Sequence, residues 1–171
     1  HYDGDRYAAL TAVVDACWGA PFRLVLAREI LDRLGMQDSV PGQDLGNAEP
    51  SVAGLFDPRA LDRYQRTLSR IAQPYATDSK GRTAKSPFPP PGINAAAGLV
   101  STARDLAIYD RGLTDHVLLR EETQELAWTP ARTTLGQPVP YGLGWFVQSI
   151  DGERVVWHYG LWGGAFSSLL V

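Results

Sequence analysis

The tripeptide His158-Tyr159-Gly160 has the residue types that best fit the edge of a binding or catalytic site. It follows a run of β-branched and aromatic residues that predicts a strand over 154–157, and a glycine there lets a ligand approach the backbone. An imidazole can donate, accept or hold a proton near neutral pH. Taken alone, a structural histidine packed beside Trp157 and Trp162 is the plainer interpretation.

A self-contained catalytic set is missing from the sequence. It has no G-x-S-x-G, H-E-x-x-H or phosphate-binding glycine loop, and no S-x-x-K. The run from Ser101 to Arg104 imitates the last motif, but arginine cannot act as the base that activates a serine. We interpret Ser101 as a residue that marks the start of a helix. The single cysteine, Cys17, excludes a cysteine-based metal cluster and is predicted to be a small buried hydrophobe.

Helical periodicity predicts three helices in the first part of the chain. The first covers residues 5–17 and is ended by Gly19, and the second opens at Pro21 and ends at Gly35. The third begins at Asp57-Pro58, a cap followed by a first-turn proline. The predicted apolar face of the second helix consists of Phe22, Val25, Leu26, Ile30 and Leu34.

The rest of the chain changes from helices to strands. Thr102 and Asp105 predict a capping box at the start of a fourth helix, and a short helix is expected around 120–128. Residues 36–56 and 73–92 are rich in proline and glycine and are predicted to be loops. From Tyr141 onward the sequence predicts an antiparallel meander, with its first hairpin turn at Asp151-Gly152.

This order, helices first and strands last, predicts an α+β fold with an antiparallel sheet flanked by helices. The helical part is expected to cover about 1–130 and the strands about 141–171. The chain opens on His1 without a leader and closes inside the apolar run 166–171. Because domain termini usually lie at the surface, we interpret the sequence as a partial domain.

Composition limits the classes of function. The chain has 171 residues, 44% of them hydrophobic, with 16 Lys and Arg against 19 Asp and Glu and a net charge of −3. This balance offers no basic patch for nucleic acid, and no apolar run reaches the roughly 20 residues that a membrane-spanning helix needs. We therefore expect neither a nucleic-acid partner nor a membrane span.

Six blocks of the sequence, in this order, resemble the class C-like branch of the serine β-lactamase and penicillin-binding-protein superfamily. The resemblance covers the whole chain, and the blocks at 98–106 and 141–145 are the most specific to this branch. The blocks are YDGDRYAAL at 2–10, GAPF at 19–22, ILDRLGM at 30–36, GLVSTARDL at 98–106, YGLGW at 141–145 and HYG at 158–160.

The resemblance implies a β-lactamase/transpeptidase-like fold and acyl transfer through an acyl-enzyme. In this family the serine of S-x-x-K attacks the acyl carbonyl, and a tyrosine from the second motif helps to move its proton. Tyr2 matches that tyrosine, and His158, Tyr159 and Gly160 match the third motif. Leu161 follows that motif, where the family supplies an oxyanion-hole N–H from the backbone. Neither a cofactor nor a metal is implied.

The sequence departs from the family pattern at three points, and each limits the functional roles that the resemblance implies. Gly4 stands where the family usually has Asn or Ser, so one side-chain hydrogen bond is lost. His158 stands where true β-lactamases usually have Lys, and an ordinary imidazole is largely neutral at pH 7. This favours an esterase or D-amino-acid peptidase over an efficient β-lactamase. The S-x-x-K motif would precede His1, so this chain alone is expected to be inactive.

Two other interpretations of the sequence are alternatives to the interpretation as part of a serine hydrolase. A non-catalytic binding or regulatory module could keep this fold and lose the chemistry, and Gly4 favours that reading. A complete small α+β domain is disfavoured by the abrupt ends. For the hydrolase, the expected partners are a small ester, peptide or β-lactam substrate and the missing N-terminal part of its own domain. Self-association through an open sheet edge is also expected. The resemblance favours a bacterial protein in the periplasm or secreted, although the sequence itself leaves the compartment unknown.

Overall fold

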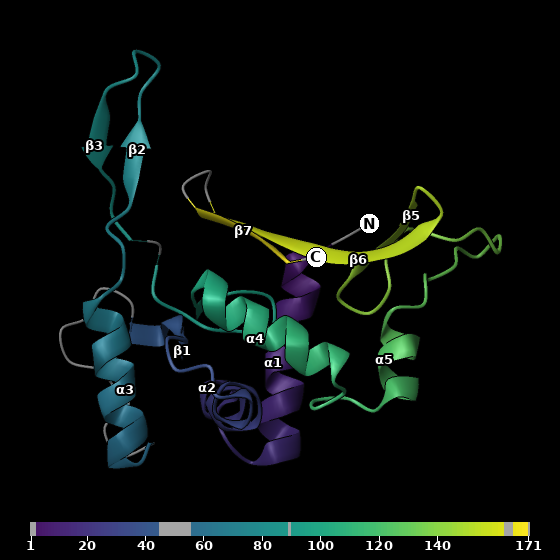
Figure 1. Ribbon diagram of the computed structural model, residues 1–171, viewed down its shortest axis with the longest axis horizontal. Coiled ribbons are helices and arrows are strands. Elements are labelled where there is room, and N and C mark those ends of the chain that lie inside the picture. Colours follow the sequence, from purple (N-terminus) through teal and green to yellow (C-terminus); the bar gives the residue numbers. More distant parts are fainter. Residues whose placement is uncertain (1–2, 45–55, 89, 163–165, 171) are drawn as a thin grey trace. The chain divides into compact units, whose positions relative to one another are not determined.

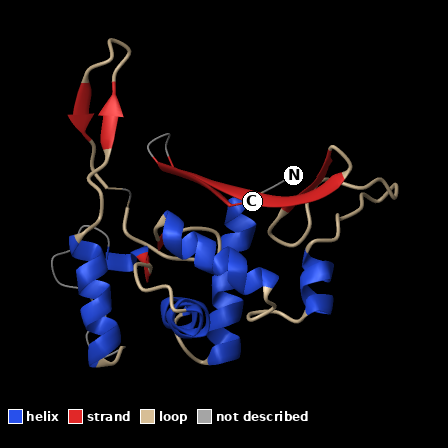
Figure 2. Ribbon diagram, in the orientation of Figure 1, coloured by secondary structure: helices blue, strands red, loops and turns tan. Residues whose placement is uncertain are grey.

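The computed structural model describes residues 3–44, 56–88, 90–162 and 166–170. The chain divides into two compact units, His1–Ile108 and Tyr109–Val171. Helices dominate the first unit and strands the second (Figure 1, Figure 2). This order confirms the α+β prediction.

The first helix, α1 (Gly4–Trp18), starts and ends as predicted. The Asp3 carboxylate accepts the N–H of Asp5 at 3.0 Å, and Gly19 ends the helix with a φ of 61°. The prediction of a buried Cys17 is wrong, because its side chain is exposed. No residue of α1 is buried. Of the predicted apolar face, Tyr7 and Val14 are half-buried, whereas Leu10, Val13 and Cys17 are exposed.

The second helix changes its winding partway along. α2 (Phe22–Leu26) runs directly into a π-helical segment, η1 (Ala27–Asp32), and Gly35 follows with a φ of 74°. The buried residues of this stretch are Leu24, Ala27 and Leu31. The residues of the predicted face are only half-buried.

The core of the first unit lies between α3 (Pro58–Ser69) and a short strand pair. Asp57 caps α3 as predicted and accepts the N–H groups of Arg59 and Ala60 at 2.9 Å. Tyr64 packs on Val40, and its hydroxyl donates to the Pro41 carbonyl at 2.6 Å. This placement ties α3 to the strand pair.

The segment predicted as a loop over 36–56 contains regular structure. β1 (Val40–Pro41) pairs with β4 (Leu99–Val100), and the 3₁₀ turn η2 (Gly42–Asp44) follows β1. Gly42 donates to the carbonyl of Gly98 at 2.7 Å. A Cβ on Gly42 would lie 2.4 Å from that oxygen, so this position requires glycine. The remainder of this loop prediction, 45–55, lies outside the described residues.

The second predicted loop, 73–92, contains an antiparallel hairpin. β2 (Tyr75–Thr77) pairs with β3 (Thr83–Lys85), and every residue of both strands is exposed. Asp78 accepts the N–H groups of Lys80 and Arg82 through one carboxylate oxygen and so closes the turn. Prolines flank the hairpin on both sides, and a high density of proline predicts irregular structure, so the local composition does not indicate these strands.

Helix α4 (Ala103–Thr114) has half of its predicted capping box. The Thr102 hydroxyl accepts the Asp105 N–H at 3.2 Å, which is the expected cap. The Asp105 carboxylate instead accepts the Ser39 hydroxyl at 2.6 Å and the Asp38 N–H at 2.8 Å. Ser101 bonds the same Ser39 hydroxyl at 2.7 Å, so its role is to extend this buried network rather than to cap the helix.

The second unit contains α5 (Glu121–Ala127) and a three-stranded antiparallel sheet. Its strands, β5 (Phe146–Ile150), β6 (Glu153–Trp162) and β7 (Phe166–Leu170), lie in the order β5-β6-β7. Asp151 and Gly152 both have positive φ, 53° and 87°, as a two-residue hairpin turn requires. The predicted meander is confirmed.

A helix that crosses a membrane must be both long and apolar. Within the described residues, no single helix is both long and apolar enough to cross a membrane. The pair formed by α1 and the Phe22–Asp32 helix meets the criterion only when joined, across a bend of 79°.

Candidate active site

Strand β6 carries the candidate residues His158, Tyr159, Gly160 and Leu161. They were expected at the end of a strand, but β6 continues through them to Trp162. The pairing explains the difference. β5 pairs with β6 only as far as Trp157, whereas β7 pairs with β6 from His158 onward. Beyond Trp157, the β5 side of β6 therefore has no strand partner among the described residues.

The His158 ring is half-buried, with a hydrogen-bond partner at each nitrogen. Nε2 lies 3.0 Å from the hydroxyl oxygen of Tyr141, and Nδ1 lies 2.7 Å from the carbonyl oxygen of Tyr159. The ring is therefore held from both sides. The Tyr159 side chain is 48% exposed.

Aromatic rings surround this pair. The Phe146 ring stacks on Trp157, with centroids 4.5 Å apart, and meets the Tyr141 ring edge-on at 4.8 Å and 88°. The Trp157 indole N–H donates to the Gln148 side chain at 2.8 Å. Because aromatic pairs in these geometries favour fixed ring orientations, Tyr141 is constrained independently of His158.

The loop that carries Tyr141 is anchored to the end of α5. The Leu143 N–H donates to the Ala127 carbonyl at 2.8 Å, and the Gly142 N–H donates to the Trp145 carbonyl at 2.8 Å. A Cβ on Gly142 would lie 2.2 Å from the Ala127 oxygen, so only glycine fits. Tyr141 then bridges to Phe146 beside the first pair of the β5–β6 ladder.

A bidentate ion pair joins α5 to β6. Arg154 donates to both carboxylate oxygens of Glu125, at 2.6 and 2.7 Å. These hydrogen bonds lower the pKa of Glu125 below its ordinary value and raise the pKa of Arg154. The Arg154 guanidinium also lies 5.7 Å from the centre of the Trp128 ring. The pair holds β6 and the anchor of the Tyr141 loop together.

Sequence reasoning gave Tyr141 no role, although it belongs to one of the resemblance blocks. The Asp151-Gly152 turn fixes the β5–β6 register, which pairs Phe146 with Trp157. His158 is the next residue of β6 after this last pair. The sequence feature that could have indicated a role for Tyr141 is the pair of glycines Gly142 and Gly144. They allow the chain to fold back onto β5, so that Tyr141 lies beside this strand. The φ of Gly144 is 84°.

The remaining predicted site residues are Tyr2 and Leu161. Tyr2 lies outside the described residues. The backbone of Leu161 belongs to β6 and pairs with Ser167. Within the described part of the chain, no group of three or more His, Cys, Asp or Glu side chains is placed to hold a metal ion.

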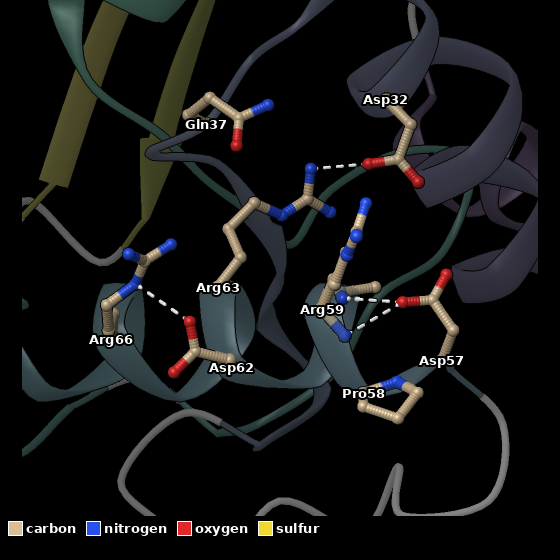
Figure 3. Close-up of a pocket in the computed structure, with 9 residues that line it drawn as sticks. Asp32, Gln37, Asp57, Pro58, Arg59, Asp62, Arg63 and Arg66 are labelled. Atoms are coloured by element: carbon tan, nitrogen blue, oxygen red, sulfur yellow. Dashed lines mark hydrogen bonds and ion pairs between the residues drawn. The ribbon is translucent and has the colours of Figure 1, made fainter.

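A hollow of about 850 Å³ lies elsewhere, in the first unit, around the start of α3 (Figure 3). Two of its arginines form ion pairs within it, Arg63 with Asp32 and Arg66 with Asp62. Asp57 is occupied as the helix cap, and these amide hydrogen bonds lower its pKa. None of the predicted site residues lines this hollow, so the candidate site remains at β6.

Comparison with known proteins gives one family and several relatives. The beta-lactamase family model matches residues 1–171. Penicillin-binding protein 4* of Bacillus subtilis (strain 168) is 31% identical over 81 residues, which is 47% of this chain and 18% of that protein.

Solved structures share the fold. The octameric penicillin-binding protein homologue from Pyrococcus abyssi has a TM-score of 0.68 at 25% identity, over 94% of this chain and 33% of that chain. The D-amino acid amidase from Ochrobactrum anthropi SV3 has a TM-score of 0.62 at 19% identity, over 94% of this chain and 42% of that chain. The chain thus spans less than half the length of each of these relatives.

Proposed function

Because the chain belongs to the beta-lactamase family, we propose that it is part of a serine hydrolase that works through an acyl-enzyme. The nucleophilic serine and its lysine belong to a part of the protein outside residues 1–171. From the resemblance, we assign proton transfer at the serine to Tyr2 and a supporting role in the reaction to His158. The isolated chain has no turnover, because it lacks the group that is acylated.

The observation that carries this proposal is the placement of His158-Tyr159-Gly160 on β6. From His158 onward the β5 side of this strand has no strand partner among the described residues, so its backbone groups can serve a substrate. An extended peptide or acyl chain can line up along such an edge. The backbone N–H of Leu161 supplies one oxyanion-hole donor.

The substrate class follows from the group at position 158. A lysine would offer a fixed cation for a carboxylate, whereas an imidazole offers one only when it is protonated. We therefore place the substrates among esters and D-amino-acid peptides or amides, with β-lactams as poorer substrates. The amidase of similar fold fits this range but does not determine it.

The sheet edges give a second proposal, which concerns assembly. β5 and β7 are the outer strands of the described sheet, and an uncovered strand edge invites pairing with another chain. We propose that the isolated 171-residue chain self-associates, and that the missing part of its own domain prevents this in the whole protein. Analytical ultracentrifugation that shows a stable monomer of the isolated chain would reject it.

The test of the hydrolase proposal uses the full-length protein. Hydrolysis of a chromogenic ester, a D-amino-acid amide and a β-lactam is measured before and after a serine-directed fluorophosphonate. Turnover that the reagent abolishes supports the proposal. Tyr2→Phe should lower kcat/KM by about 10²–10⁴-fold with little change in Tm, since only a proton-transfer group is removed. Binding of a substrate without turnover would favour the non-catalytic module, which the absence of a side chain at Gly4 also favours.

A further inference from the structure

We infer that Tyr141 is a positioning residue that holds the His158 imidazole in the tautomer with its proton on Nδ1. The inference rests on the proposed function for the use of His158 in the reaction, but the tautomer itself does not depend on it.

The tautomer follows from the two partners of the ring. Nδ1 lies 2.7 Å from the Tyr159 carbonyl, and a carbonyl oxygen can only accept, so Nδ1 carries the proton and donates. In the neutral ring, Nε2 is then the acceptor. The Tyr141 hydroxyl, 3.0 Å away, therefore donates its hydrogen to Nε2.

Tyr141 is itself held by contacts that do not involve His158. Its ring meets Phe146 edge-on, and its backbone bridges to the same residue. Its carbonyl accepts the Ala131 N–H at 2.9 Å. The adjoining Gly142 lies against the Ala127 carbonyl, where no larger residue fits. The hydroxyl is thus presented to His158 by a preformed loop.

This arrangement determines what the site offers to a substrate. In the neutral ring both nitrogens are engaged, one with the Tyr159 carbonyl and one with Tyr141, so the imidazole has no N–H left for a ligand. Protonation adds a hydrogen to Nε2, which then donates to the Tyr141 oxygen. The neutral pair therefore suits an uncharged acyl group better than a carboxylate-bearing ligand.

The first experiment measures the tautomer directly. Side-chain nitrogen NMR on the full-length protein with ¹⁵N-labelled histidine reports the Nδ1–H to Nε2–H ratio of His158, with its signal assigned by His158→Gln. We expect the Nδ1–H form to predominate. Tyr141→Phe keeps the ring that packs on Phe146 and removes only the hydroxyl, so the ratio should fall about fivefold, the value of one ordinary hydrogen bond. Tyr75→Phe, which removes an exposed hydroxyl from β2, should leave the ratio unchanged.

The second experiment measures ester hydrolysis by the same proteins. Tyr141→Phe should lower kcat/KM by about tenfold through misorientation of His158, with Tm nearly unchanged. In a His158→Gln background the same substitution should change kcat/KM less than about twofold, because its target is gone. A purely structural role for Tyr141 would instead lower Tm and keep its full effect in that background.

The outcomes separate the inference from the proposed function. A tautomer ratio that Tyr141→Phe leaves unchanged overturns the inference. A shifted ratio with unaltered kcat/KM overturns the role of the held tautomer in the reaction. A wild-type protein with no hydrolase activity contradicts the proposed function and the reaction role of Tyr141. In that case a shifted ratio still supports the positioning of His158.

Discussion

The Asp105 carboxylate accepts the hydroxyl of Ser39 at 2.6 Å, and both residues are almost completely buried, although 66 positions separate them in sequence. The same carboxylate oxygen accepts the Asp38 N–H. This contact fixes the segment before β1 against the first turn of α4, and it uses the residue that appeared to belong to a local capping box.

Loss of the Asp105 carboxylate should be costly to the fold. Asp105→Ala leaves the buried Ser39 hydroxyl and the Asp38 N–H without their acceptor, so we expect the free energy of unfolding to fall by about 3 kcal/mol. Urea unfolding of the full-length protein measures it. Asp110→Ala, at an exposed position on the same helix, should change stability by less than about 0.5 kcal/mol. Equal effects for the two variants would contradict a role for this network.

The approach of Gly142 to Ala127 predicts a second sensitivity. In Gly142→Ala the new methyl group would lie 2.2 Å from a backbone oxygen, so the Tyr141 loop has to move. We expect a loss of about 1–3 kcal/mol in unfolding free energy together with reduced hydrolysis. The control is Gly92→Ala, where the added Cβ meets nothing within 4 Å. Unaltered stability and activity in Gly142→Ala would show that the loop does not need this contact.

Much of the fold could be predicted because its signals are local. Asp57 caps a helix, Gly19 and Gly35 end helices, and Asp151-Gly152 turns a hairpin, each through its own backbone preferences. The β2–β3 hairpin was missed because its turn depends on Asp78 bonding two amides inside a proline-rich stretch. The π-helical turn at Ala27–Asp32 has no local signature in the sequence. The buried residues of this helix, Leu24, Ala27 and Leu31, are not those of the predicted face.

The strand that carries the candidate site could be predicted from the sequence, but the residue that hydrogen-bonds to His158 could not. His158 could be placed from its motif, whereas Tyr141 reaches it only through the β5–β6 register and a glycine loop packed on α5. The exposure of Cys17 was not predictable either. Helical spacing shows that a face is apolar and does not show what covers it.

The ion pair between Glu125 and Arg154 should make stability depend on pH. The hydrogen bonds from Arg154 lower the folded-state pKa of Glu125 below the ordinary 4.5, so the pair stabilises the protein above that value. The contribution is lost as the pH falls through the lowered pKa. Glu125→Gln should therefore lower Tm more at pH 7 than at pH 3. Glu121→Gln, on the same helix, should show a smaller difference, and a Tm loss for Glu125→Gln that is equal at both pH values would contradict the assignment.

Substitution of His158 tests the proposed substrate range. His158→Lys introduces a fixed cation, so hydrolysis of carboxylate-bearing β-lactams should improve relative to neutral esters. The two rates and Tm are measured on the same samples. A lower Tm with an unchanged rate ratio would identify His158 as a packed structural residue beside Trp157.

The central claim is that this chain belongs to a hydrolase whose acylated serine lies outside residues 1–171. Intact-mass analysis and peptide mapping after treatment with a fluorophosphonate or a fluorescent penicillin test it most directly. We predict one stoichiometric adduct on the full-length protein, at a serine followed three positions later by lysine, and none on the isolated chain. An adduct at Ser101 or any other serine of this chain, or an unlabelled full-length protein, would contradict the claim.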